Sequence, residues 1–122
     1  MSKKKLEADI SSAFIKLQLD LIGKGPQEAK TYIINDMLIT RFKGVLTVEE
    51  KHLVNHTTGR RLVKQMRTLL REQYSKEYEK IVEEYTGCKV LSSHSDISTK
   101  TGERIEVFIL EKDLEQFLLV NE

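Results

Sequence analysis

The segment 94–103, with the sequence HSDISTKTGE, carries the densest set of reactive side chains in the chain. Its hydroxyls and turn amides can hydrogen-bond a phosphate or a carboxylate, and Lys100 adds positive charge. Asp96 could orient or deprotonate His94 from the same face of a strand. These residues predict an anion or polar-ligand site; the more ordinary interpretation is a polar hairpin turn whose side chains bond their own backbone. The candidate ligand-binding residues are Lys24, His94, Asp96, Ser98, Thr99, Lys100 and Thr101.

The other reactive side chains form incomplete sets. His52 and His56 stand four residues apart, as zinc ligands on one helical turn do, but the glutamate that follows the first histidine in a metalloprotease helix is missing. Cys88 is the only cysteine, so an intrachain disulfide is excluded, and a reducing cytosol fits best. Serine nucleophile elbows, Walker loops and dinucleotide fingerprints are absent. We therefore predict no catalytic residue, no metal and no cofactor.

The loop 21–26, with the sequence LIGKGP, faintly matches the glycine loop of K-homology RNA-binding domains, in which the backbone approaches nucleotides. Pro26 occupies the place of the second required glycine, and a strand rather than a helix is expected to follow. The charge gives no support, because 20 Lys and Arg residues are balanced by 19 Asp and Glu residues. We interpret the loop as a helix-ending turn and expect no nucleic-acid partner.

A chain of 122 residues can position these side chains on one core, so we expect a single domain over 1–122 with its core in residues 6–110. Apolar residues recur at helical spacing in some segments and alternate as in strands in others. The order predicts an α+β fold of two layers, a four-stranded antiparallel sheet with helices on one face. Helices are expected at 6–22, 47–55, 59–85 and 113–120, and strands at 30–34, 37–43, 89–97 and 103–110. The expected helix caps are Thr47 with Glu50 in a capping box, Thr57 or Thr58, and Asp113.

The first predicted hairpin, joined by a turn at Asn35 and Asp36, is apolar on both faces. A small sheet with one face in water should instead alternate apolar and polar side chains. We therefore expect the second face to be covered by another helix or by a second subunit. The two faces carry Tyr32, Ile34, Met37 and Ile39 on one side and Ile33, Leu38 and Phe42 on the other.

The helix predicted at 59–85 would be about 40 Å long, whereas a compact domain of this size is roughly 35 Å across. It must bend, most plausibly near Ser75, or protrude into a dimer contact. Its first half is basic and its second half acidic, so an antiparallel dimer of this helix would pair opposite charges; the alternative is a solvated face with pairs inside the chain. The candidate dimer or partner residues are Ile33, Leu38, Phe42, Arg60, Arg67 and Arg71.

Three stretches together carry a family resemblance. They are GKGP at 23–26 leading into YIINDM at 32–37, GRRLVKQMR at 59–67, and HSDISTKTGE at 94–103. With these stretches the chain resembles the MpsC-like family, small bacterial proteins catalogued as a domain of unknown function, over about residues 8–110. The family takes its name from a sodium-translocating, membrane-potential-generating system whose associated components are linked to ion and inorganic-carbon uptake.

The resemblance implies a soluble accessory or regulatory protein and supplies no catalytic residues. No apolar run approaches the roughly 18 residues that a bilayer crossing needs, so we expect no membrane insertion and no role as the translocating channel. The leading hypothesis is a cytoplasmic homodimer that binds a protein partner, such as a membrane transport component. The alternative is a small-anion or metabolite sensor using Lys24, His94, Asp96, Lys100 and Thr101. An RNA-binding module or an enzyme comes third.

Overall fold

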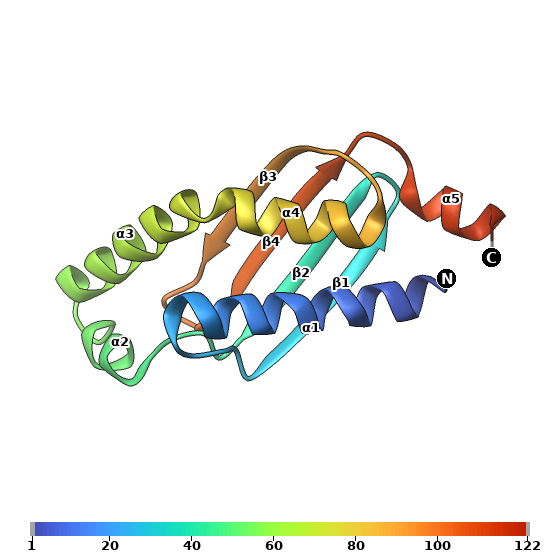
Figure 1. Cartoon of the computed structure of the whole chain (residues 1–122). Helices are drawn as coiled ribbons and strands as arrows, with labels where there is room; N and C mark the ends of the chain where they lie inside the picture. Colours follow the sequence, from blue (N-terminus) through green and yellow to red (C-terminus); the bar gives the residue numbers. More distant parts are fainter. Residues whose placement is uncertain (1, 122) are drawn as a thin grey trace.

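The computed structural model describes residues 2–121 and confirms the predicted α+β fold. Figure 1 shows two layers, with α1, α3 and α4 on one face of the sheet and α5 beyond its end. The elements are α1 (Lys3–Ile22), β1 (Glu28–Ile34), β2 (Met37–Lys43), α2 (Val48–Leu53), α3 (Thr57–Gln73), α4 (Ser75–Thr86), β3 (Val90–Ile97), β4 (Arg104–Leu110) and α5 (Leu114–Val120).

The sheet is antiparallel throughout, in the order β1-β2-β4-β3. The turn at Asn35 and Asp36 joins β1 to β2 as predicted, and Asn35 adopts a positive φ of 54°. Helix α1 ends at Gly23, whose φ of 83° is the left-handed conformation that glycine adopts most easily. The capping box of Thr47 and Glu50 is confirmed at the start of α2.

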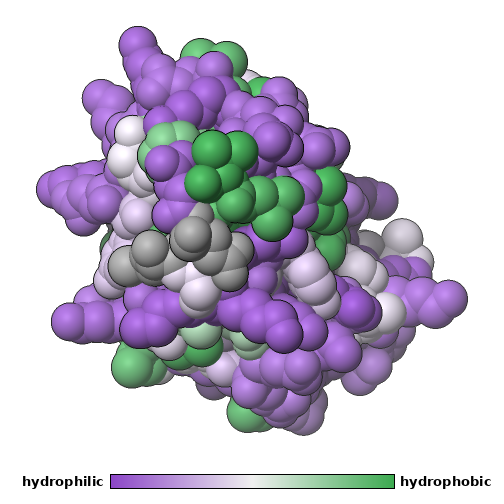
Figure 2. All heavy atoms as spheres, turned by 90° about the vertical axis from the view of Figure 1, so that its right-hand side faces the viewer, coloured by the Kyte–Doolittle hydropathy of each residue, from purple (hydrophilic) through white to green (hydrophobic). Residues whose placement is uncertain are grey.

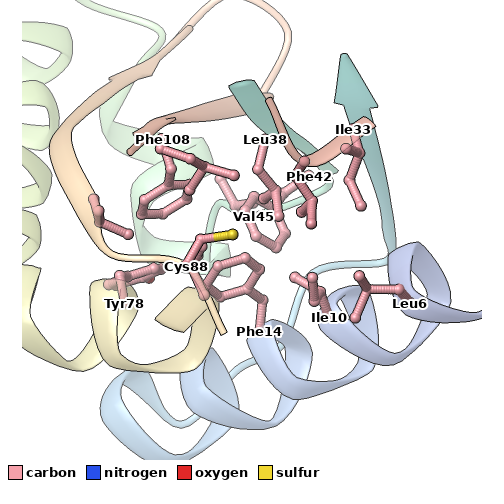
Figure 3. Packing of buried hydrophobic residues seen from close by; sticks show 14 of the residues in the cluster. Leu6, Ile10, Phe14, Ile33, Leu38, Phe42, Val45, Tyr78, Cys88 and Phe108 are labelled. Carbon is pink, nitrogen blue, oxygen red and sulfur yellow. The ribbon is translucent and has the colours of Figure 1, made fainter. Parts of the chain in front are cut away.

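The hydrophobic core lies between the sheet and the helices α1 and α4 (Figure 3). Phe14 of α1 is at its centre, with its ring centroid 5.9 Å from Phe42, 5.6 Å from Tyr78 and 5.7 Å from Phe108. Aromatic pairs at such distances add stabilisation beyond the area they bury. The core therefore joins β2, β4, α1 and α4 through one aromatic cluster.

Three of the residues predicted for a dimer surface belong to this core. Ile33, Leu38 and Phe42 are fully buried within the single chain. Helix α1 packs on β1 and covers this face, but the other face of the hairpin has no helix on it in Figure 1, so the second cover expected from the sequence is not found within the described residues. The placement of these three residues at a subunit interface is wrong, since they are not accessible to a second subunit.

The predicted helix at 59–85 is two helices. The helical conformation is interrupted at Tyr74, next to the predicted bend at Ser75. Helices α3 and α4 follow one another across the molecule. Ser75 contributes to the break, because its Oγ donates a hydrogen bond to the Arg71 carbonyl and accepts one from Arg71 Nη1. The N-cap of α3 is His56, which makes no side-chain cap bond, so the expectation of Thr57 or Thr58 is wrong.

Helix α3 buries a different face from the one its apolar residues predict. Its buried residues are Gly59, Val63, Arg67 and Arg71, which recur every four positions. Its larger apolar residues point outward instead, since Leu62, Met66 and Leu69 are 53%, 45% and 66% exposed. The reason lies in tertiary packing, because α3 packs on Glu50 of α2, on the Val45 carbonyl in the loop before α2, and on the polar half of β4.

The side chains of strand β4 explain why α3 buries its arginines and exposes its leucines. Arg104, Glu106, Phe108 and Leu110 face the helices and are buried, whereas Ile105, Val107 and Ile109 face the other side of the sheet. Phe108 and Leu110 join the hydrophobic core, and Arg104 and Glu106 continue the same face under α3. The inner face of the sheet is thus apolar at one end and ionic at the other.

Candidate functional site

A small pocket of about 180 Å³ lies between α3 and the strands β3 and β4. Three arginines line it together with hydroxyl side chains, which is unusual for the interior of so small a domain. The residues central to it are Arg67, Arg71, Ser75, Ser95 and Arg104. We call these residues the arginine pocket.

Arg67 holds the first turn of α2 against α3. Its Nε donates to Glu50 Oε2 at 2.8 Å, and its Nη2 donates to Glu50 Oε1 and to the Val45 carbonyl, each at 2.6 Å. Arg67 and Glu50 are both 3% exposed. Burial disfavours the ionised carboxylate, but hydrogen bonds from Arg67 and the Thr47 amide outweigh it and hold the pKa of Glu50 below its ordinary value.

Glu106 is the second buried carboxylate, and two arginines share it. Arg71 Nε donates to Oε1 at 2.7 Å, and Arg104 Nη1 lies 3.3 Å from Oε2. Ser95 also donates to Oε2, at 2.7 Å. The side chain of Glu106 has no exposed surface, so these donors replace all its contact with water.

The Arg71 guanidinium is held from two further directions. Its central carbon lies 4.4 Å from the centre of the Tyr78 ring, a cation–π contact, and its Nη1 donates to Ser75. Its Nη2 is buried and makes no hydrogen bond within residues 2–121. Burial, followed by the negative charge of Glu106, raises the pKa of the Tyr78 hydroxyl, so Tyr78 remains neutral beside this cluster.

Electrostatically, the cluster has an excess of positive charge. Three guanidinium groups, on Arg67, Arg71 and Arg104, meet two buried carboxylates, on Glu50 and Glu106. Acidic residues also reach the rim, where Asp96 is exposed and lies 3.4 Å from Lys64, and Glu72 is exposed. The arginines of this arrangement can bind a small anion.

The ligand-binding residues predicted from 94–103 do not lie together in the structure. His94 is exposed, and its Nε2 lies 3.3 Å from Ser92 Oγ. Asp96 pairs with Lys64 and accepts a hydrogen bond from the Ile97 amide, so it does not contact His94. Asp96 alone of the predicted set lines the arginine pocket.

Three of the remaining predicted residues line a second, wider pocket of about 490 Å³, and the other two lie close to it in the chain or by a hydrogen bond. Thr99, Lys100 and Thr101 line it, and Lys24 donates from Nζ to the carbonyl of Gly44 at its wall. Ser98 accepts a hydrogen bond from the Thr101 amide through Oγ and from the Gly102 amide through its carbonyl, as in a polar hairpin turn. The predicted set is therefore spread over three places and not gathered in one site.

The residues predicted for a dimer helix also separate. Arg60 is exposed, where it bonds the Val54 carbonyl and Thr57. Arg67 and Arg71, expected on a charged outer surface, are buried in ion pairs inside the chain, so this part of the prediction is wrong. With two of its five basic residues buried and a break at Tyr74, the helix does not present the continuous charged face expected for an antiparallel dimer.

Sequence reasoning missed Glu50, Arg104 and Glu106 as parts of a buried cluster. The signal was present in β4, where Arg104 and Glu106 share a face with Phe108 and Leu110. The alternating residues Ile105, Val107 and Ile109 conceal it, because they form a wholly apolar set that favours the opposite face as the buried one. Among residues 2–121 no three His, Cys, Asp or Glu side chains are grouped to hold a metal, and His52 and His56 are both exposed.

The outer face of the sheet is a second candidate surface. Figure 1 shows that α1, α3 and α4 all lie on the opposite side. Tyr32 and Ile34 remain 38% and 41% exposed, and the other apolar side chains of this face are partly exposed. We call this set the outer sheet face: Tyr32, Ile34, Met37, Ile39, Ile105, Val107 and Ile109.

A smaller apolar surface lies at the end of the molecule that carries α5. Figure 2 looks onto this end, where hydrophobic atoms gather within a mainly hydrophilic surface. The exposed apolar side chains of α5 are Phe117, Leu119 and Val120. Asp113 caps this helix as predicted, accepting a hydrogen bond from the Gln116 amide.

Comparison with known proteins finds relatives of the same size. The family model described as Na+-translocating membrane potential-generating system (MpsC) matches residues 2–112. The uncharacterized protein YbcI of Bacillus subtilis (strain 168) is 38% identical over 117 residues, which cover 96% of this chain and 94% of YbcI. The uncharacterized protein YrhF of the same organism is 30% identical over 102 residues, 83% of this chain and 84% of YrhF. No solved structure shows significant similarity. Within the described residues no helix is long and apolar enough to cross a membrane.

Proposed function

Because the chain belongs to the MpsC family, we propose that it is a cytosolic accessory protein of a membrane transport system and that it acts as a homodimer joined through the outer sheet face. The observation that carries the dimer is the uncovered apolar face itself. Contiguous apolar patches of several side chains are uncommon on monomeric proteins and mark interaction surfaces. The link to transport rests on the description of the family alone.

The outer sheet face is continuous across three strands. Tyr32, Ile39 and Val107 pair across the three strands and form one row of side chains. Two residues further along each strand, Ile34, Met37 and Ile109 form a second row. Two sheets with such faces pack about 10 Å apart, with their strands within roughly 30° of each other. A second sheet would remove these side chains from water, at about 25 cal/mol for each Å² of apolar surface buried.

A second copy of this chain fits that face because the apolar rows can pack on themselves. A two-fold axis parallel to the strands, between β2 and β4, stacks the rows of Ile39 and Val107 and of Met37 and Ile109 on the same rows of the second copy. The neighbouring row adds little charge, because Arg41 is paired with Glu103 and Asp96 is paired with Lys64 of α3. One apolar surface used twice favours an isologous dimer.

The interface is tested by substituting one residue in its centre. Val107→Lys introduces a charge between Ile39 and His94, and we expect a monomer by size-exclusion chromatography with light scattering. The matched control is Leu69→Lys, which places the same charge on an exposed apolar site of α3. The proposal is contradicted if Val107→Lys keeps the mass of the unmodified chain, or if only Leu69→Lys dissociates. Circular dichroism of both variants confirms that each is folded.

The accessory role needs a separate readout in cells. In a strain deleted for this chain, we expect a lower Na+-dependent membrane potential, which the unmodified chain restores and Val107→Lys does not. Restoration by Val107→Lys, once shown to be monomeric, would mean that the dimer is not needed. An unchanged membrane potential in the deletion strain would contradict the role in transport while leaving the dimer intact.

A further inference from the structure

We infer that the arginine pocket binds a small tetrahedral oxyanion of the phosphate or sulfate type. This site goes beyond the proposed dimer, because it lies on the helix side of the sheet, opposite the outer sheet face. It also differs from the anion site predicted at 94–103, of which only Asp96 reaches it.

The buried charge of the cluster calls for an anion. Arg67, Arg71 and Arg104 are 3%, 7% and 5% exposed, so each has lost most of its hydration. The two carboxylates buried with them compensate only two of the three charges. A buried charge without a partner is strongly unfavourable, and an oxyanion in the adjoining pocket would supply the missing negative charge.

Donor groups remain for such an anion. The hydrogen bonds of Arg104 within residues 2–121 all run through Nη1, which leaves its other N–H groups for a ligand. Arg71 Nη2 also has no acceptor in that range, but it is closed off from solvent and so does not itself face the pocket. The planar guanidinium presents paired N–H groups at the spacing of oxygens in a phosphate or carboxylate. Ser75 and Ser95 line the same pocket, but their hydroxyl protons are already donated to the Arg71 carbonyl and to Glu106. Guanidinium N–H groups are therefore the donors available around this cavity, which no lysine lines.

The size and rim of the pocket limit the ligand. A volume of about 180 Å³ is below the range of about 300–1,000 Å³ typical of sites for larger organic ligands. Asp96 and Glu72 at the rim would repel an extended anion such as a nucleotide. Lys64, 3.4 Å from Asp96, offsets one of these charges. A compact inorganic oxyanion satisfies the inner arginines without reaching the acidic rim.

Isothermal titration calorimetry with sodium phosphate and with sodium sulfate tests this site, using sodium chloride at equal ionic strength as the control. We expect saturable binding of phosphate or sulfate by the unmodified chain and none of chloride. Arg104→Gln should weaken that binding at least tenfold, while Lys100→Gln, at the second pocket, should leave it unchanged. Val107→Lys should bind phosphate or sulfate as the unmodified chain does, so a failure of the proposed dimer would leave this result unchanged.

A second variant keeps the test decisive if Arg104→Gln does not fold. Ser95→Ala removes the hydroxyl that contacts Arg104 Nη1 and Glu106, so it loosens the position of Arg104 without removing a charge, and we expect about a threefold loss of affinity. The inference is overturned if phosphate and sulfate produce no more heat than chloride. It is also overturned if binding is unchanged in both pocket variants; a loss in Lys100→Gln would then place the anion at the second pocket.

Discussion

Arg71 and Glu106 join α3 to the middle of the sheet, with Nε of the arginine 2.7 Å from Oε1 of the glutamate. Both side chains are buried, and the guanidinium also stacks on Tyr78 of α4. The contact between α3 and the sheet is therefore ionic where most small domains have an apolar seam. This frees the leucines of α3 to face solvent and gives the inner face of β4 two chemically distinct halves.

Removing the Glu106 charge should cost more stability than any surface substitution. Glu106→Gln leaves Arg71 and Arg104 without their shared carboxylate, and breaking such a buried pair costs about 3–5 kcal/mol of unfolding free energy. Urea unfolding at pH 7 measures the loss. Glu103→Gln, which breaks the exposed pair with Arg41, is the control and should stay near the unmodified chain. Equal effects of the two substitutions would contradict the central role of Glu106.

Glu50 predicts a specific acid sensitivity. Its pKa is lower in the folded chain than in the unfolded one, so its contribution to stability is complete above the unfolded value, about 4.3, and is lost as pH falls through the folded value. We expect Glu50→Gln to be less stable at pH 7 and to lose less stability than the unmodified chain between pH 5 and pH 3. If the free energy of unfolding falls equally with pH in the two proteins, the ionisation of Glu50 does not contribute to the acid sensitivity.

Gly59 should tolerate no side chain. A Cβ at this position would lie 1.8 Å from the carbonyl oxygen of Leu53, so α2 and α3 would have to move apart. We expect Gly59→Ala to lower the thermal unfolding midpoint by several degrees, despite the better helix propensity of alanine. Thr58→Ala, at the exposed neighbouring position, should change stability by less than about 0.5 kcal/mol. A more stable Gly59→Ala would disprove the close packing of the two helices.

The reversed orientation of α3 can be tested by two substitutions of apolar residues. Val63→Ala removes buried methyl groups and should cost about 2 kcal/mol. Leu69→Gln alters a side chain that is 66% exposed and should change the free energy of unfolding by less than about 0.5 kcal/mol. The opposite ranking, measured by urea unfolding, would place Leu69 in the core and Val63 outside it.

Much of the fold could be predicted because local signals agree with tertiary packing. Asn35 supplies the positive φ of the hairpin turn, Thr47 the capping box and Asp113 the cap of α5, and each lies where its chemistry requires. The break beside Ser75 was predicted from the length of the helix and is real. Such features depend on a few neighbouring residues, which are visible in the sequence.

The faces of α3 and β4 could not be predicted in the same way. Both segments have two periodic sets of residues, and apolarity selected Leu62 with Met66, and Ile105 with Val107, as the buried sets. The structure buries Arg67, Arg71, Arg104 and Glu106 instead, because Arg67 pairs with Glu50 of α2, and Arg71 and Arg104 share Glu106. Arg104 and Glu106 are two positions apart on β4, but the pairs of Arg67 and Arg71 join residues 17 and 35 positions apart and leave no local signal. The arginine pocket therefore does not follow from local patterns alone.

Sedimentation equilibrium of the unmodified chain at micromolar concentration tests the central claim most directly. The account predicts a single species with twice the 14.1 kDa mass of one chain, which dissociates only on dilution. A mass of 14.1 kDa throughout the concentration range would mean that the outer sheet face stays exposed in solution, and would contradict the homodimer.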